Sequence, residues 1–148
     1  MTVTEATPER YQNLFRMGFW GLLAVVTLVR LMMAGTIVDE SHYVMYARRL
    51  AWGYLDHPPL MAWLTAPVTL LGDNLFYYRL IPILSNFFSV VLLRRLALHL
   101  WEDERIAFLA LVILTLLPYQ HLLMVALLPD APLNLFWCAT LVSFRLSI

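Results

Sequence analysis

Acidic and histidine side chains occur at three separated places in this chain. Asp39 and Glu40 are adjacent carboxylates, Asp56 and His57 pair a carboxylate with an imidazole, and Asp130 lies between two prolines. A carboxylate can accept a proton from a hydroxyl, and an Asp-His pair can bind a metal or hydrogen-bond a sugar. Each place also has a structural interpretation, because Asp39 and Asp130 suit helix caps or turns and Asp56-His57 suits a polar turn.

Arginine supplies all the basic charge, and one arginine is placed where it could bind an anion. The chain has ten arginines and no lysine. Arg79 opens an apolar stretch, where a guanidinium beside a lipid-phosphate pocket would hold phosphate through its rigid fork. The alternative is a boundary arginine whose charge reaches the membrane interface. The sequence contains no glycine-rich phosphate loop, nucleophile elbow or cysteine cluster.

The composition predicts a membrane environment for these residues. Hydrophobic residues make up 61% of the 148-residue chain and charged residues only 14%, whereas soluble domains carry about 25% charged residues. A soluble fold could not hide this much apolar surface from water. The formal net charge is zero, which argues against a nucleic-acid partner. We therefore expect an all-α, polytopic membrane protein.

Four long apolar stretches are predicted to be transmembrane helices, since a bilayer core needs roughly 20 apolar residues. The stretches cover residues 17–37, 75–93, 106–128 and 133–148. Residues 1–16 form a polar N-terminal segment, and 17–148 form the membrane domain.

The segment 38–74 is too charged to span a membrane and is interrupted by prolines and glycines. Apolar residues at helical spacing within Glu40–Leu50, and the run Leu60–Leu71 after Pro58-Pro59, predict two short amphipathic helices at the membrane surface. Asp39, Glu40, Asp56 and His57 would then lie together in this outer segment.

The distribution of arginine predicts the orientation. Under the four-span arrangement one side carries Arg10, Arg16, Arg94, Arg95 and Arg105, and the other carries Arg48, Arg49 and Arg79. The excess places the N-terminus in the cytoplasm. The loop 38–74 and the Asp130 turn then face the outside together, which is the precondition for a shared site.

Four motifs in order resemble a known family. They are Asp39-Glu40-Ser41-His42-Tyr43, the run Trp52-Gly53-Tyr54-Leu55-Asp56-His57-Pro58-Pro59-Leu60, Arg79-Leu80, and Pro129-Asp130-Ala131-Pro132. Their order and spacing resemble the N-terminal part of the bacterial dolichyl-phosphate-mannose-protein mannosyltransferase-like family (glycosyltransferase family 39), which has lipid A aminoarabinose transferase as a relative. The resemblance extends over roughly 17–148.

This resemblance implies a C-type membrane glycosyltransferase fold in the inner membrane. It implies transfer of a sugar from a polyprenyl-phosphate donor, at the outer face, to a lipid, glycan or protein acceptor. By the same resemblance Asp39 is the catalytic base and Asp130 completes the catalytic site. Glu40, Tyr43, Asp56 and His57, which lie in the matching motifs, are the expected substrate-binding residues, and Arg79 joins them as our own hypothesis from its guanidinium chemistry. The sequence establishes no cofactor, although some relatives use a divalent metal.

Members of that family are several times longer, so we expect this chain to be an N-terminal portion that holds the acidic half of a site. One alternative is a small, non-catalytic membrane protein that binds a lipid-linked sugar or a partner subunit. Another is a piece of a channel or transporter that uses Arg30, His121 and Asp130 as path residues. The transport interpretation is weaker because the acids cluster in loops rather than in mid-span.

Overall fold

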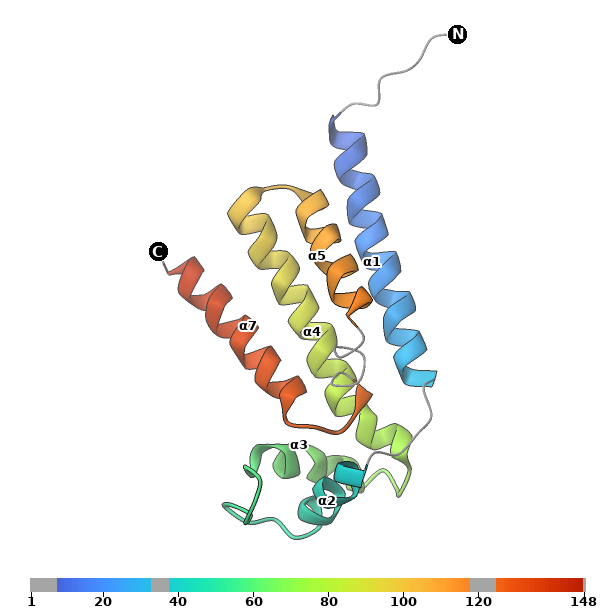
Figure 1. The fold of residues 1–148 in the computed structure, drawn as a ribbon, viewed down its shortest axis with the longest axis vertical. Helices are drawn as coiled ribbons and strands as arrows, with labels where there is room; N and C mark the ends of the chain where they lie inside the picture. The colour runs from blue at the N-terminus through green and yellow to red at the C-terminus, as the bar shows by residue number, and fades with distance from the viewer. Residues whose placement is uncertain (1–7, 33–37, 118–124, 148) are drawn as a thin grey trace.

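The computed structural model describes residues 8–32, 38–117 and 125–147, and every regular element in these ranges is an α-helix. The described helices are α1 (Pro8–Met32), α2 (Val38–Ala47), α3 (Leu60–Thr69), α4 (Leu75–Trp101), α5 (Glu104–Leu116) and α7 (Asp130–Leu146). Four long helices form a bundle, and the short α2 and α3 lie together at one end of it (Figure 1). The all-α prediction is confirmed.

Two helices are longer than their predicted spans because polar residues extend them. Helix α1 begins at Pro8 rather than near residue 17, since proline suits the first turn of a helix and Glu9 complements its dipole. Helix α4 is capped at its start by Asn74, whose side chain accepts a hydrogen bond from the Phe76 amide at 2.9 Å. It continues past the predicted boundary to Trp101 and ends at Glu102, whose φ is 51°.

The last two bundle helices also have defined starts. The Asp103 carboxylate caps α5 by accepting from the Arg105 amide at 2.8 Å. Helix α5 ends at Leu116, and Gln120 and His121 of the predicted span lie outside the described residues. Helix α7 starts at Asp130, so this acid lies in a first helical turn, where the dipole favours negative charge.

Two buried clusters hold the fold together. The bundle cluster joins α1, α4 and α5 through Phe19, Leu23, Val90, Ala97, Ala107 and Leu111. The second cluster joins α2, α3 and α4 to the turn before α7 through Tyr43, Met61, Tyr78 and Leu127. The polar loop segment is therefore a packed subdomain on the bundle rather than a free linker, which fixes the side chains it carries.

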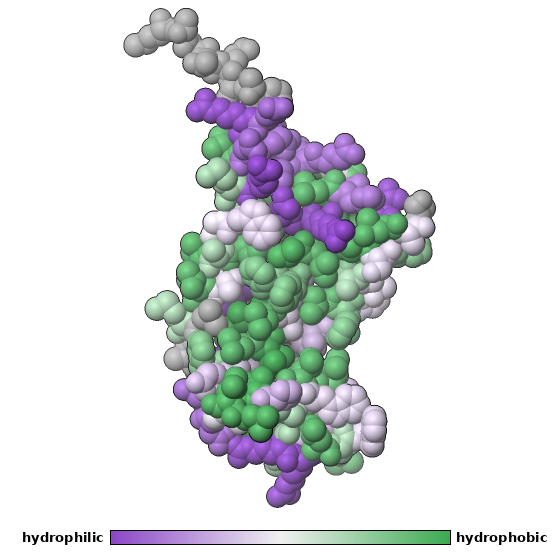
Figure 2. All heavy atoms as spheres, turned by 180° about the vertical axis from the view of Figure 1, so that it is seen from behind, coloured by the Kyte–Doolittle hydropathy of each residue, from purple (hydrophilic) through white to green (hydrophobic). Residues whose placement is uncertain are grey.

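The surface of the bundle suits a bilayer. Among the described helices, α1 (over Glu9–Arg30) and α4 are long and apolar enough to cross a membrane. The face in Figure 2 shows a broad hydrophobic region between hydrophilic ends. Exposed apolar side chains such as Leu28, Phe88 and Ile113 contribute to the bundle surface. Lipid would cover these side chains at no hydrophobic cost.

Candidate functional site

A buried ion pair lies where α2 meets α4. Arg79 donates from Nε to Glu40 Oε1 and from Nη2 to Glu40 Oε2, both at 3.3 Å. Only 2% of Glu40 and 6% of Arg79 is exposed. Two predicted substrate-binding residues are thus brought together, and they bind each other in a two-pronged pair.

Glu40 also fixes the turn before α7. Its Oε1 accepts a hydrogen bond from the Leu127 backbone amide at 3.1 Å, and Leu127 is fully buried. Asp39 precedes Glu40 in α2, and Asp130 follows Leu127 by three residues. The Glu40 contact therefore brings the chain at the two predicted catalytic acids to the same end of the bundle. Asp130 is partly exposed there, while the Asp39 side chain lies outside the described part of the chain.

Asp56 and His57 lie in a loop that tyrosines organise. The Tyr46 hydroxyl donates to Asp56 Oδ1 at 2.8 Å, and His57 Nδ1 lies 3.0 Å from Asp56 Oδ2. The Tyr54 ring stacks on Tyr46 at 4.1 Å, and its hydroxyl donates to the Tyr46 and Arg49 carbonyls at 2.9 and 3.1 Å. These contacts make the Asp-His pair part of a fixed loop.

Sequence reasoning did not single out Tyr46 and gave Tyr54 no role of its own, because the partners of both depend on how the loop folds back. Tyr43 was singled out, and it is almost fully buried with its ring 4.9 Å from His57 in an edge-on contact. Tyr43 belongs to the second buried cluster, so its contact with His57 attaches the loop to the core.

Hydrogen bonding stabilises the charged form of Asp56. The Tyr46 hydroxyl, followed by His57, lowers the pKa of the Asp56 carboxyl below its ordinary value. A lowered folded-state pKa means that this carboxylate stabilises the loop above its unfolded pKa. The contribution is lost as the pH falls through the folded value.

We expect Tyr46→Phe to raise the pKa of Asp56 toward its ordinary value, because the variant removes the main hydrogen bond to the carboxylate. The measurement is a carboxyl-carbon NMR titration of the chain in detergent micelles. Tyr11→Phe, a change in α1, serves as the control and should leave the Asp56 titration unaltered. An unchanged Asp56 pKa in Tyr46→Phe would show that the tyrosine does not stabilise the carboxylate.

A second acidic contact ties the end of α2 to the start of α4. Asp73 accepts from the Tyr78 hydroxyl at 2.6 Å and forms an ion pair with Arg48. The Tyr78 hydrogen bond, followed by Arg48, lowers the pKa of Asp73. Beyond the charge of each residue this contact has no local signal, since 25 positions separate Arg48 from Asp73.

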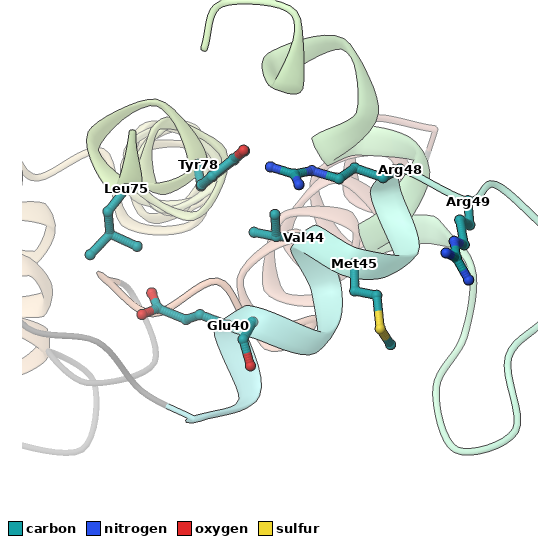
Figure 3. A pocket seen from close by; sticks show the side chains of 8 residues that line it. Glu40, Val44, Met45, Arg48, Arg49, Leu75 and Tyr78 are labelled. Atoms are coloured by element: carbon teal, nitrogen blue, oxygen red, sulfur yellow. The ribbon is translucent and has the colours of Figure 1, made fainter. Parts of the chain in front are cut away.

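An open pocket of about 500 Å³ lies between α2 and α4. Figure 3 shows Glu40 toward one end of the pocket and Arg48 and Arg49 toward the other, with the Arg48 guanidinium reaching toward Tyr78. Ser41 also lines the pocket. The remaining walls are Val44, Met45, Leu75 and Tyr78. Within the described ranges no ion pair or side-chain hydrogen bond involves the Arg49 guanidinium. The pocket thus combines apolar walls with a cation at its rim.

The described residues do not form a metal centre. No group of three His, Cys, Asp or Glu side chains gathers among them closely enough to hold an ion. Asp56 and His57 supply two candidate ligands, and neither lines the pocket between α2 and α4.

The family model for dolichyl-phosphate-mannose-protein mannosyltransferase matches residues 56–147, which is more than half of the chain. The chain belongs to this family. Of the residues singled out above, Asp56, His57, Arg79 and Asp130 lie inside the matched region of the mannosyltransferase family. Asp39, Glu40 and Tyr43 precede it.

Family membership and two long apolar helices make this a membrane protein with a glycosyltransferase-type domain. No curated protein and no solved structure gives a significant match to the chain. Roles for individual residues are therefore inferred from their geometry in this fold.

Proposed function

We propose that the protein transfers a sugar from a polyprenyl-phosphate donor to an acceptor hydroxyl at the outer face of the inner membrane. The observation that carries the proposal is the mannosyltransferase family match over residues 56–147. We further propose that α1, α4, α5 and α7 cross the membrane, with the N-terminus in the cytoplasm. The subdomain of α2 and α3 then lies at the outer surface, where a lipid-linked donor would present its head group.

The pocket between α2 and α4 is the proposed site for the donor phosphate. Arg79 was the sequence-based candidate for this role, but its guanidinium is engaged by Glu40. Arg49 has no such partner among the described side chains and lines the pocket with Arg48. Phosphate favours arginine, and the apolar walls from Val44, Met45 and Leu75 suit the first part of a lipid chain.

Asp39 is the proposed general base. It would accept the proton from the acceptor hydroxyl while the acceptor oxygen forms a bond to the anomeric carbon. The bond from that carbon to the phosphate oxygen breaks at the same time, and the polyprenyl phosphate departs with the electron pair. Attack from the face opposite the phosphate inverts the anomeric configuration. Asp130, which the Glu40–Leu127 hydrogen bond keeps at the same end of the bundle, is proposed to complete the site.

Membranes that contain the chain, alone and within any longer reading frame, test the activity with radiolabelled polyprenyl-phosphate sugars. Transfer of label above that of membranes without the protein supports the proposal. Specific binding of the donor without transfer by either form would instead favour the non-catalytic sugar-lipid-binding protein.

Arg49→Gln is expected to weaken donor binding about tenfold, because a charge-assisted hydrogen bond at a partly open site contributes about 1.4 kcal/mol. The measurement is saturation binding of the labelled donor to the protein in micelles. Arg10→Gln, an exposed arginine on α1, is the matched control and should bind donor as the wild type does. Equal affinity of Arg49→Gln and wild type would remove Arg49 from the donor site.

A further inference from the structure

A second pocket lies at the other end of α4. It has a volume of about 320 Å³ and lies between the C-terminal parts of α4 and α7. Its lining consists of Arg95, Leu96, Leu98, His99, Val142, Arg145 and Leu146. Tyr78 of the first pocket and Arg95 are 17 positions apart on one helix, which is about 25 Å at 1.5 Å per residue. The two pockets are therefore separate.

Helical spacing explains how this groove arises. Arg95 and His99 are four positions apart on α4, and Val142, Arg145 and Leu146 follow the same spacing on α7, so each set shares one helix face. The two helices pack together along the bundle, running in the same direction (Figure 1). Val142 is buried between them, whereas Arg95, His99 and Arg145 are exposed. The groove thus has an apolar floor and a basic rim.

The basic rim has no internal counter-charge. Within the described ranges no ion pair or side-chain hydrogen bond involves Arg95, His99 or Arg145. The neighbouring Arg94 behaves differently, because it pairs with Glu104 and its guanidinium lies 5.5 Å from the Phe19 ring. One arginine of this adjacent pair serves the fold, and the other is turned toward the groove.

The position along α4 indicates what kind of anion fits. Trp101, at the end of α4, is 58% exposed, as is typical of aromatic residues at a membrane interface. A ligand here would meet arginine forks near the interface and the buried Val142, which lies one turn deeper on α7. A phosphate with attached acyl chains matches both surfaces, whereas a free phosphate matches only the first.

We propose that this groove binds the head group of an anionic phospholipid, with the phosphate between Arg95 and Arg145 and the start of an acyl chain against Val142. The proposal is independent of the glycosyltransferase function, because the groove shares no residue with the pocket between α2 and α4. It assigns Arg95 and Arg145 to lipid recognition, a role that the orientation argument did not give to either.

Native mass spectrometry of the full chain in detergent micelles tests the proposal with phosphatidylglycerol, phosphatidylcholine and inorganic phosphate as probes. Wild type should retain phosphatidylglycerol in preference to phosphatidylcholine. Arg95→Gln combined with Arg145→Gln should lower phosphatidylglycerol affinity by at least about tenfold, because two charge-assisted contacts are lost. Arg10→Gln removes an exposed charge from α1, outside the groove, and should have no effect.

Equal retention of both lipids, binding of inorganic phosphate as tight as that of the lipid, or unchanged affinity in the double variant would each overturn the proposal. Circular dichroism shows whether the double variant keeps its helix content. If it does not, the salt dependence of wild-type binding decides the matter. Phosphatidylglycerol retention should weaken as NaCl rises, and salt-independent retention would count against basic recognition.

Discussion

Asp39→Asn is expected to lower the rate of sugar transfer by roughly 10²- to 10⁴-fold, which is the range that a positioned general base contributes. Asparagine has almost the same shape but cannot accept the proton of the attacking hydroxyl. The rate is measured in membranes at saturating donor, so that a change in donor binding does not enter. Donor affinity and thermal stability should remain close to those of wild type.

Two comparisons make this result specific. Glu102→Gln removes an exposed carboxylate at the far end of α4, and its transfer rate should equal that of wild type. Wild-type transfer should also fall at acid pH as the base becomes protonated, and the residual rate of Asp39→Asn should lose that dependence. Transfer by Asp39→Asn at the wild-type rate would refute the assignment of Asp39 as the base.

Sequence reasoning located the short helices well because their ends have local signals. The predicted run Leu60–Leu71 corresponds to α3, Leu60–Thr69, which begins directly after Pro58-Pro59. Proline fixes its own φ and restricts the residue before it, so a helix start at this point can be read from the sequence. The run Glu40–Leu50 corresponds to α2, Val38–Ala47, and was predicted from apolar residues at helical spacing.

The long helices were located less well because hydropathy marks the part of a helix in lipid rather than the helix itself. Helix α1 extends through polar residues from Pro8, and α4 continues past Arg94 to Trp101. The predicted span ends at residue 93, directly before Arg94. In the fold Arg94 pairs with Glu104 from α5. Such pairing depends on tertiary structure and has no local signature.

The candidate site shows the same division between local and tertiary information. The sequence singled out Glu40 and Arg79 by residue type, and the fold brings both to one place. It could not indicate that they bind each other, because 39 positions separate them. An acid and an arginine in a family motif are equally compatible with substrate binding and with mutual pairing. Only the folded contact between α2 and α4 distinguishes these roles.

Glu40→Gln is expected to destabilise the protein by about 3–5 kcal/mol, because it removes the carboxylate that pairs with the buried Arg79 guanidinium. The amide oxygen can still accept the hydrogen bond from the Leu127 amide, so the loss reports mainly on the ion pair. Stability is measured by denaturation of the chain in micelles, followed by circular dichroism. The exposed control Glu102→Gln should change stability by less than about 0.5 kcal/mol.

The double variant Glu40→Met with Arg79→Met tests whether the loss of stability comes from the broken ion pair or from other contacts of Glu40. Two apolar side chains of similar length remove both buried charges, so this variant should be more stable than Glu40→Gln by several kcal/mol. A double variant as unstable as Glu40→Gln would show that the cost lies elsewhere, for example in the Leu127 contact. If the two adjacent acids differ in role as proposed, their variants give opposite results. Asp39→Asn loses sugar transfer but keeps its stability, whereas the main effect of Glu40→Gln is a loss of stability. If Glu40→Gln instead abolished transfer at wild-type stability, Glu40 would belong to the chemistry and the pair with Arg79 would be part of the substrate site.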